Sequence, residues 1–396
     1  MGIFWRSYSL HKNRAFTSYT FKYNPFVLED IMITPTMISE GWRIFKRARN
    51  VHSKGFNQYP GDVKAICRQI ILDCYNHEYE YFMTSTGHYC QFYTRDFGMC
   101  TQSLLDLGYE NQVLNTLKYA LTCFEKGGKI TTSITPQGKA FDFPTYSPES
   151  VAYLLRSLSL ADAQDLVRKH KDFINNEIRK AVKYIDPSSG LLRKNVHVSS
   201  IKDHAIRKSD CYTNCMLGML SHYATKLGLE NPLKQYDYAK TIERHFWTGT
   251  HFLEDLSGHN IVTGDATTFP FWTGIFDDKV RFQKAFDTLR KSGLDQPFPL
   301  KYTNGHAKHR MIPVQLLTKE YEHTAIFMHL GLCFLQVVKK YDLNYAQVYL
   351  KKYTELIQRH KNFLEVFDAF GKPYKTALHV SDEGMLWAAM YLDLMD

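Results

Sequence analysis

The stretch QFYTRDFGMC, Gln91 to Cys100, places the adjacent Arg95 and Asp96 directly before an apolar pattern. The apolar residues that follow recur at the three- and four-residue spacing of one helix face, which predicts a helix over 97–107. A charged pair at a helix start either caps the helix or faces a pocket and binds a ligand rich in hydroxyl groups. Arg95 and Asp96 are therefore candidates for both roles.

The same helical spacing continues along the chain, and few stretches alternate as strands do. Apolar segments alternate with amphipathic ones, as expected of inner helices covered on most sides and outer helices with one wet face. We therefore predict an all-α fold in which six helical hairpins close into an (α/α)6 barrel. An irregular helical domain or a solenoid is the alternative, and the lack of a fixed-period repeat argues against the solenoid. The pattern predicts helices at 62–82, 97–107, 110–126, 147–158, 161–185, 209–226, 231–246, 267–275, 278–292, 320–341, 344–366 and 381–394.

Residues 1–60 show no clean pattern and are predicted to form a short irregular N-terminal extension packed on the barrel domain, 61–396. Long polar connections separate several of the predicted helices, and loops of this length are usually functional or disordered. Their aromatic, acidic and basic residues favour function, and in a helical barrel they would gather on one face and form a pocket. These connections lie at 129–146, 186–208, 250–266 and 293–319.

Composition excludes several classes of function. The net charge is +9, but its cations are scattered rather than gathered in runs, which disfavours a nucleic-acid partner. No apolar run is long enough to span a membrane, and the first residues do not read as a signal peptide, so we expect a soluble, cytoplasmic protein. The 8 cysteines include no CxxC and are expected as reduced thiols. Neither a metal nor another cofactor is expected, and the oligomeric state stays open.

Two segments carry carboxylates suited to acid–base chemistry. In SSIKDHAIRKSDCYTN, Asp203 follows Lys202 and is either a general acid or an N-cap or surface ion pair. In TKEYEHTAIFMHLG, Glu320 and Glu322 precede a long apolar segment. They are either first-turn acids that stabilise a helix dipole or a general base, and the neighbouring His323 either binds a ligand hydroxyl or packs.

Two further segments carry candidate pocket residues. In TGDATTFPFWTGIF, Asp265 or Thr267 is a natural N-cap, and Trp272 is either a core residue or a platform on which a sugar ring stacks. In FDFPTYSPESVAYLL, Ser147, Pro148 and Glu149 match a helix start without any function, whereas Tyr146 lies before that helix, where a pocket wall is expected.

Taken in order, several segments between about 80 and 395 resemble the six-hairpin glycosidases, the superfamily of glucoamylases, trehalases and amylo-α-1,6-glucosidases. YTRDFGMCTQSLLDLG resembles the Arg-Asp motif that binds sugar hydroxyls, which implies that role for Arg95 and Asp96. DPSSGLLRKN, SSIKD and SDCYTNCMLGML together resemble a debranching-enzyme run, which implies that Asp203 is the general acid. Its implied neighbours in the site are Asp210, Tyr212 and Asn214.

The remaining segments complete this order. KEYEHTAIFMHLG resembles the segment that carries the general base, which implies that role for Glu320, with Glu322 as the alternative. GDATTFPFWTGIF resembles the segment with an acidic residue before an inner helix, and DEGMLWAAMYLDL resembles the closing helix, where Trp387 is family-like. The chain departs from the family where Ile201 and Lys202 replace the usual Trp before the acid.

The resemblance implies an inverting, glucosidase-like glycoside hydrolase that acts on an oligosaccharide or glycoconjugate. The substrate-binding residues are expected to be Arg95, Asp96, Tyr146, Lys202, Asp210, Asn214, Asp265, Trp272, Glu322 and His323. Two other readings stay open: a non-catalytic carbohydrate-binding or scaffold barrel, and another sugar enzyme on the same fold, such as an epimerase, a lyase or an unsaturated-uronide hydrolase. Lys202, Arg207 and Lys208 would suit an acidic sugar.

Overall fold

The computed structural model describes residues 34–305, 310–312 and 318–396. These described residues belong to one compact unit. The first part of the predicted extension and parts of the 293–319 connection lie outside the described residues. Among the described helices, none has the length and apolar character needed to cross a bilayer.

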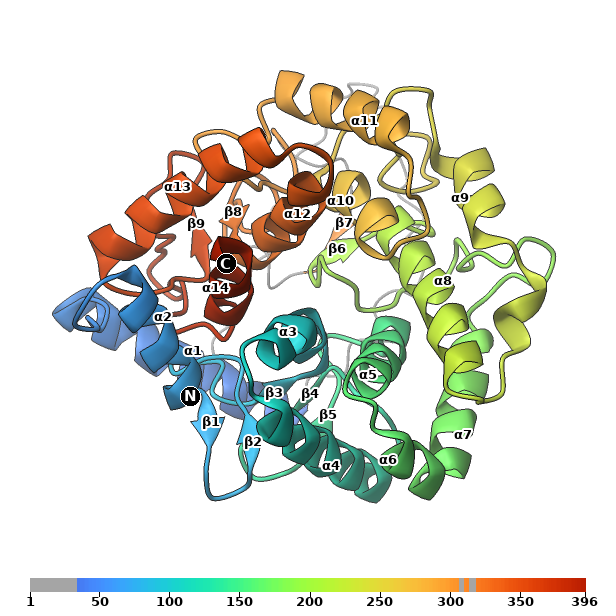
Figure 1. The fold of residues 1–396 in the computed structure, drawn as a ribbon, viewed down its shortest axis with the longest axis horizontal. Coiled ribbons are helices and arrows are strands. Elements are labelled where there is room, and N and C mark those ends of the chain that lie inside the picture. The colour runs from blue at the N-terminus through green and yellow to red at the C-terminus, as the bar shows by residue number, and fades with distance from the viewer. Residues whose placement is uncertain (1–33, 306–309, 313–317) are drawn as a thin grey trace, which may run out of the picture. The chain divides into compact units, whose positions relative to one another are not determined.

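Six inner helices form a closed ring in which each contacts the next and the last contacts the first (Figure 1). An outer helix precedes each inner one along the chain, so the described residues form six helical hairpins, and the predicted (α/α)6 barrel is confirmed. The inner helices are α3 (Thr94–Asp106), α5 (Pro148–Leu160), α8 (Cys211–Lys226), α10 (Gly264–Trp272), α12 (Met328–Tyr341) and α14 (Ala388–Met395). The outer helices are α2 (Val63–Asp73), α4 (Glu110–Gly127), α6 (Gln164–Lys169) with α7 (Lys171–Val182), α9 (Tyr238–Phe246) after the short η2 (Pro232–Gln235), α11 (Lys279–Lys291) and α13 (Leu343–His360).

Inner and outer helices differ in burial as their sequences predict. In α12, MHLGLCFLQVVKKY, every residue from Met328 to Leu335 is buried, so that segment is covered all round. In α11, KVRFQKAFDTLRK, the buried residues recur at helical spacing and include Phe282, Phe286 and Leu289, while the opposite face is charged. The hydrophobic core thus lies in the ring of inner helices and between the two layers.

Several helix boundaries differ from the prediction. The helix predicted over 62–82 ends at Asp73, because the chain turns into the hairpin of β1 (Tyr75–Asn76) and β2 (Tyr81–Phe82). The Asn76 side chain stabilises that turn by accepting hydrogen bonds from the backbone of residues 78 and 79. The segment predicted as one helix over 161–185 is divided into α6 and α7 at His170.

The largest differences lie before the last two inner helices. The segment 320–341 was expected as one helix, but α12 begins only at Met328 and Glu320 adopts a left-handed backbone with φ of 61°. Strand β8 (Ile326–Phe327) pairs there with β9 (Val366–Phe367), so both segments are extended rather than helical. The expectation that Glu320 and Glu322 open a helix is therefore wrong.

The first described helix, α1 (Pro35–Lys54), was not predicted from the sequence. Thr34 caps it by accepting a hydrogen bond from the backbone N–H of Met37, and Pro35 occupies the first turn. Its Arg47 forms an ion pair with Glu383, which binds the helix to the connection before α14. Part of the segment expected to be irregular is thus a regular helix.

The connections that lead into the inner helices are long, and those that follow the inner helices are short. The long connections contact one another through hydrogen bonds. Thr145 donates from its backbone to the Ser199 hydroxyl and from its hydroxyl to the His197 carbonyl. The Tyr302 hydroxyl donates to the Ile201 carbonyl, and the Met328 backbone donates to the Glu365 carbonyl. Small strands add to these contacts: β3 (Phe92–Tyr93), β4 (Ser133–Ile134) and β5 (Ala140–Phe141) form one sheet, and β6 (Ala205–Ile206) pairs with β7 (Arg310–Met311). The described connections therefore gather at one end of the barrel, together with the N-termini of the inner helices.

Candidate functional site

Arg95 is the centre of a charged cluster at this end of the barrel. Its Nη1 donates to Glu149 Oε1 at 3.1 Å and to the Ser200 carbonyl at 2.7 Å, and its Nη2 donates to Asp203 Oδ2 at 3.2 Å. The Arg95 and Asp203 side chains keep 17% and 25% of their surface exposed, whereas Glu149 keeps only 2%. Arg95 and Asp203 are thus the members of this cluster that a ligand can reach.

Asp96 and Glu149 lie beneath this pair, each in the first turn of an inner helix. Burial raises the pKa of Asp96 to about 6, although Arg95 and a 3.0 Å hydrogen bond from Trp387 Nε1 act to lower it. Burial likewise raises the pKa of Glu149 to about 7 against the attraction of Arg95, and the negative charge of Asp203 raises both pKa values further. One guanidinium therefore neutralises only part of the charge of these carboxyls, so the cluster holds protons near neutral pH.

Lys202 and Arg207 are buried and already paired with carboxylates. Lys202 Nζ forms an ion pair with Glu254, and Arg207 Nη1 contacts Asp265 Oδ2 at 2.7 Å. Lys202 is therefore not placed to bind substrate as expected from the sequence, and neither Lys202 nor Arg207 favours an acidic sugar. Their role here is to neutralise buried acids. Lys208, by contrast, is exposed.

Asp210 and Asn214 have structural contacts. Asp210 caps α8 by accepting hydrogen bonds from the Thr213 backbone at 2.8 Å and from its hydroxyl. Asn214 accepts from the Leu192 backbone at 2.9 Å and donates to the Asp210 carbonyl at 2.7 Å. These contacts fasten the connection before α8 to its helix, and they occupy both polar atoms of the Asn214 side chain, which was expected to bind substrate.

Two predicted pocket aromatics have their ring contacts with residues outside the Arg95 cluster. Trp272 ends α10 at the opposite end from Asp265, where its indole donates to Gln336 at 2.7 Å and Arg156 covers its ring at 4.7 Å. The sugar platform expected there is therefore not part of the Arg95 cluster. Tyr146 stacks on Tyr184 with ring centroids 4.8 Å apart.

Glu322, Glu320 and His323 lie on the turn before β8. Glu322 is buried, and both of its oxygens accept from the His204 backbone N–H at 2.9 Å, directly beside Asp203. Burial raises the pKa of Glu322, and the Asp203 charge adds to that rise. Glu320 is half-buried and acts electrostatically on Tyr374, and His323 is buried with its carbonyl accepting from Thr303 at 2.9 Å.

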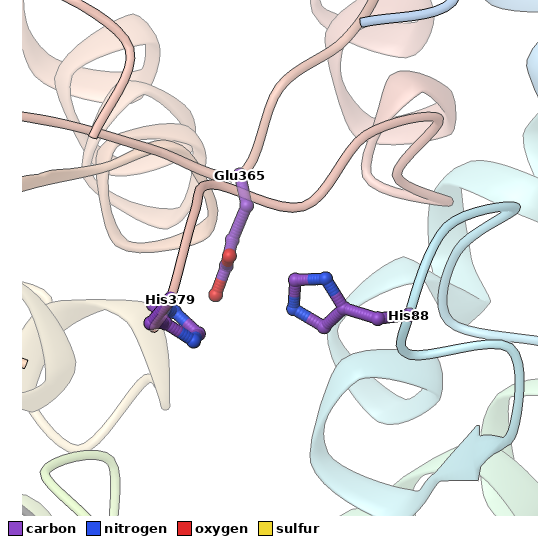
Figure 2. A group of neighbouring side chains, drawn as sticks. All are labelled: His88, Glu365 and His379. Carbon is purple, nitrogen blue, oxygen red and sulfur yellow. The ribbon is translucent and has the colours of Figure 1, made fainter. Parts of the chain in front are cut away.

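The sequence reasoning missed a cluster formed by His88, Glu365 and His379 (Figure 2). Glu365 accepts from the Tyr321 hydroxyl at 2.5 Å and from the Asp382 backbone at 2.9 Å. Burial raises the pKa of Glu365 to about 8, with further contributions from the charges of Asp382 and Asp96. The available signal was the GlyLysPro turn at 371–373, which marks a connection rather than a continuing helix.

A surface groove of about 700 Å³ lies elsewhere, between α2, α13 and α14. Its lining includes Asp62, Thr354, Gln358 and Tyr391, none of which contacts the charged cluster. The chemistry of the described residues is concentrated at the Arg95 end of the barrel, where accessible and buried carboxyls surround one guanidinium. Such an arrangement can bind hydroxyl groups and can exchange protons with a ligand.

The ring of inner and outer helices is an (α/α)6 barrel, and several solved glycosidases share this fold. A GH63 mannosylglycerate hydrolase from Thermus thermophilus, solved in complex with Tris, is similar with a TM-score of 0.57, 12% identity, and coverage of 84% of this chain and 99% of that one. A wild-type glycosidase is similar with a TM-score of 0.54, 13% identity, and coverage of 92% and 98%.

A rhamnosidase from Klebsiella oxytoca with rhamnose bound is similar with a TM-score of 0.53 and 12% identity, covering 85% of this chain and 64% of that one. No protein family profile matches the sequence, and neither does any curated protein sequence. At such identities the likeness concerns the fold, and the chemistry must be argued from the residues of this chain.

Proposed function

We propose that this protein is a glycoside hydrolase that cleaves an O-glycosidic bond of an oligosaccharide or glycoconjugate. The observation that carries the proposal is the Arg95 cluster, in which an accessible guanidinium and an accessible carboxylate cover two buried carboxyls at the mouth of a helical barrel. Charged groups that face a ligand in this way suit sugar hydroxyls and an oxocarbenium-like transition state. The similar structures of known glycosidases support the same class.

The proposed mechanism is inverting and glucosidase-like. In this proposal Asp203 acts as the general acid in its protonated form, which donates a proton to the leaving oxygen while a second carboxylate activates water on the opposite face of the sugar. Glu320 takes the base role in this proposal, with Glu322 as the alternative. Inversion requires the two carboxyls to be roughly 6.5–9.5 Å apart, which leaves room for the water.

Glu365 is a further carboxyl for which the base role should be tested. It lies on the same end of the barrel, and its pKa responds to the charge of Asp96. A Gln variant at each of 320, 322 and 365 removes the charge and keeps the shape. The base is the position at which Gln abolishes turnover without changing the far-UV circular dichroism spectrum.

The activity itself is tested by a screen of α- and β-linked gluco-, manno- and rhamno-substrates together with mannosylglycerate, with the released sugar measured. Asp203→Asn should abolish any hydrolysis that the wild type catalyses, and Asp142→Asn, which removes a carboxylate paired with Lys129, is the matched control. Proton NMR of the first sugar released should show inverted anomeric configuration. Unchanged hydrolysis by Asp203→Asn would remove Asp203 as the acid, and a retained anomer would exclude the inverting mechanism.

A further inference from the structure

Three side chains from distant parts of the chain converge at the same end of the barrel as the Arg95 cluster. His88 comes from the connection before α3, and Glu365 and His379 come from the connection before α14. One ligand atom of each lies within 4.8 Å of the others, and the three residues are only 1%, 4% and 7% exposed. Figure 2 shows the side chains of all three pointing toward one another.

The histidines of this group have unused nitrogens. Within the described part of the chain, Nε2 of His88 and Nε2 of His379 have no hydrogen-bond partner, whereas Nδ1 of His88 lies 3.2 Å from Asp382 Oδ1. Buried polar atoms are satisfied in the great majority of cases, so two unsatisfied imidazole nitrogens in one cluster call for an explanation. A cation bound between them would accept the lone pairs that no hydrogen bond uses.

We propose that His88, Glu365 and His379 bind a zinc ion. Two imidazoles and one carboxylate form a donor set that zinc favours, and it leaves a fourth position for water or a ligand. Ligands at about 2.1 Å from one tetrahedral ion lie roughly 3.4 Å apart. The three donor atoms therefore need only small side-chain rotations to reach this spacing.

Asp382 supplies the outer support that such sites require. Its Oδ1 lies 3.2 Å from His88 Nδ1, which leaves Nε2 of the same ring for the ion. The carboxylate is itself held by the backbone N–H groups of His88 and Tyr89 at 2.8 and 2.9 Å. A carboxylate behind a ligating imidazole fixes the tautomer and orientation of the ring. Glu365 accepts hydrogen bonds on both oxygens and has further lone pairs for a metal.

The inference does not depend on hydrolysis, so its test measures metal binding. The purified protein is stripped with a chelator and titrated with Zn²⁺ by calorimetry, and its metal content is measured after gel filtration. His222→Ala removes an exposed imidazole on α8 and serves as the matched control. We expect one equivalent in the wild type and in this control, and at least a 100-fold weaker affinity in His379→Ala and His88→Ala. Asp382→Asn should weaken binding 10- to 100-fold.

Co²⁺ is a second probe that needs no variant. The wild type loaded with Co²⁺ should show the visible absorption of a tetrahedral site, which keeps the test valid even where a variant fails to fold. Absence of a zinc equivalent in the wild type, or equal affinity in the wild type and a folded His379→Ala, would overturn the proposal. If the wild type binds no metal and Glu365→Gln abolishes turnover, Glu365 acts in proton transfer rather than as a metal ligand, and the proposal is wrong.

Discussion

Asp96 is a carboxyl that the fold keeps away from water, and this has a measurable cost. Its pKa of about 6 lies above the value near 4 of an unfolded chain. Between these pH values the unfolded state has lost the proton that the folded state retains, so folding stability falls as the pH rises. A shift of this size corresponds to roughly 3 kcal/mol once both states are ionised.

We therefore predict that Asp96→Asn gains stability relative to the wild type as the pH rises. Asn keeps the size of the side chain and never ionises, so the gain should be small at pH 4 and should approach about 2–3 kcal/mol at pH 7.5. Urea unfolding at the two pH values measures the difference. A free-energy difference that does not change with pH would show that Asp96 does not titrate between them.

Arg95 is predicted to stabilise the fold through Glu149 more than through the accessible Asp203. Arg95→Met should cost about 1–3 kcal/mol, because the buried Glu149 loses its cation and must take up a proton to stay buried. Glu149→Gln in the same chain replaces that carboxyl with an amide that does not ionise and should recover part of the loss. A double-mutant cycle by chemical denaturation gives the coupling energy, and additive effects of the two substitutions would contradict this account.

The sequence predicts which residue types matter at the candidate site better than it predicts their partners. Arg95 and Asp203 were both singled out, yet their contact joins residues 108 positions apart. Lys202 was expected to bind substrate, and Arg207 was expected to suit an acidic sugar, but the structure pairs these cations with Glu254 and Asp265 from later parts of the chain. Pairings of this kind depend on tertiary structure, and local spacing contains no record of them.

The close packing of helix α3 against helix α5 depends on Gly98, which has no side chain at their contact. A Cβ added at Gly98 would lie 2.6 Å from Tyr153, which is fully buried. We predict that Gly98→Ala destabilises the protein by about 2 kcal/mol or more, because the ring contact must open. Gly41 in the middle of α1 has no atom within 4 Å of such a Cβ.

Gly41→Ala is therefore the matched control and should stabilise α1 by about 0.5–1 kcal/mol through helix propensity alone. Thermal unfolding of the two variants should shift the midpoint in opposite directions. Equal losses from both substitutions would mean that the α3–α5 contact is looser than described.

Helical periodicity located every hairpin but not every helix end. It predicted α4, α5, α8 and α11 to within a few residues, because their apolar spacing stops at clear turn signals. It began α12 and α14 too early, at 320 and 381, and continued α13 to 366, where the chain instead forms buried turns and short strands such as β8 and β9. Burial makes both kinds of segment hydrophobic, and only pairing across the chain separates them.

The closed ring predicts cooperative unfolding of the barrel. Tyr391 on α14 is buried, and its hydroxyl lies 2.6 Å from Thr354 Oγ1 on α13. Tyr391→Ala should cost about 3–5 kcal/mol and should shift circular dichroism and tryptophan fluorescence transitions together, since each helix pair is supported on both sides. Separated transitions would indicate an open array of hairpins that loses its end first.

The contacts between the two ends of the chain, which close the ring of helices, also determine when the ring can form during folding. Ser85 and Asp382 are hydrogen-bonded across 297 residues, and Lys64 and Asp396 across 332. Almost the whole chain must be ordered before these groups meet, whereas each hairpin needs only neighbouring residues. The barrel should therefore assemble hairpin by hairpin with the seam closing last, and hydrogen exchange during refolding should protect α8 before α14. The candidate site, which includes Trp387 from one side of the seam and Asp96 from the other, would be the last part of the molecule to become functional.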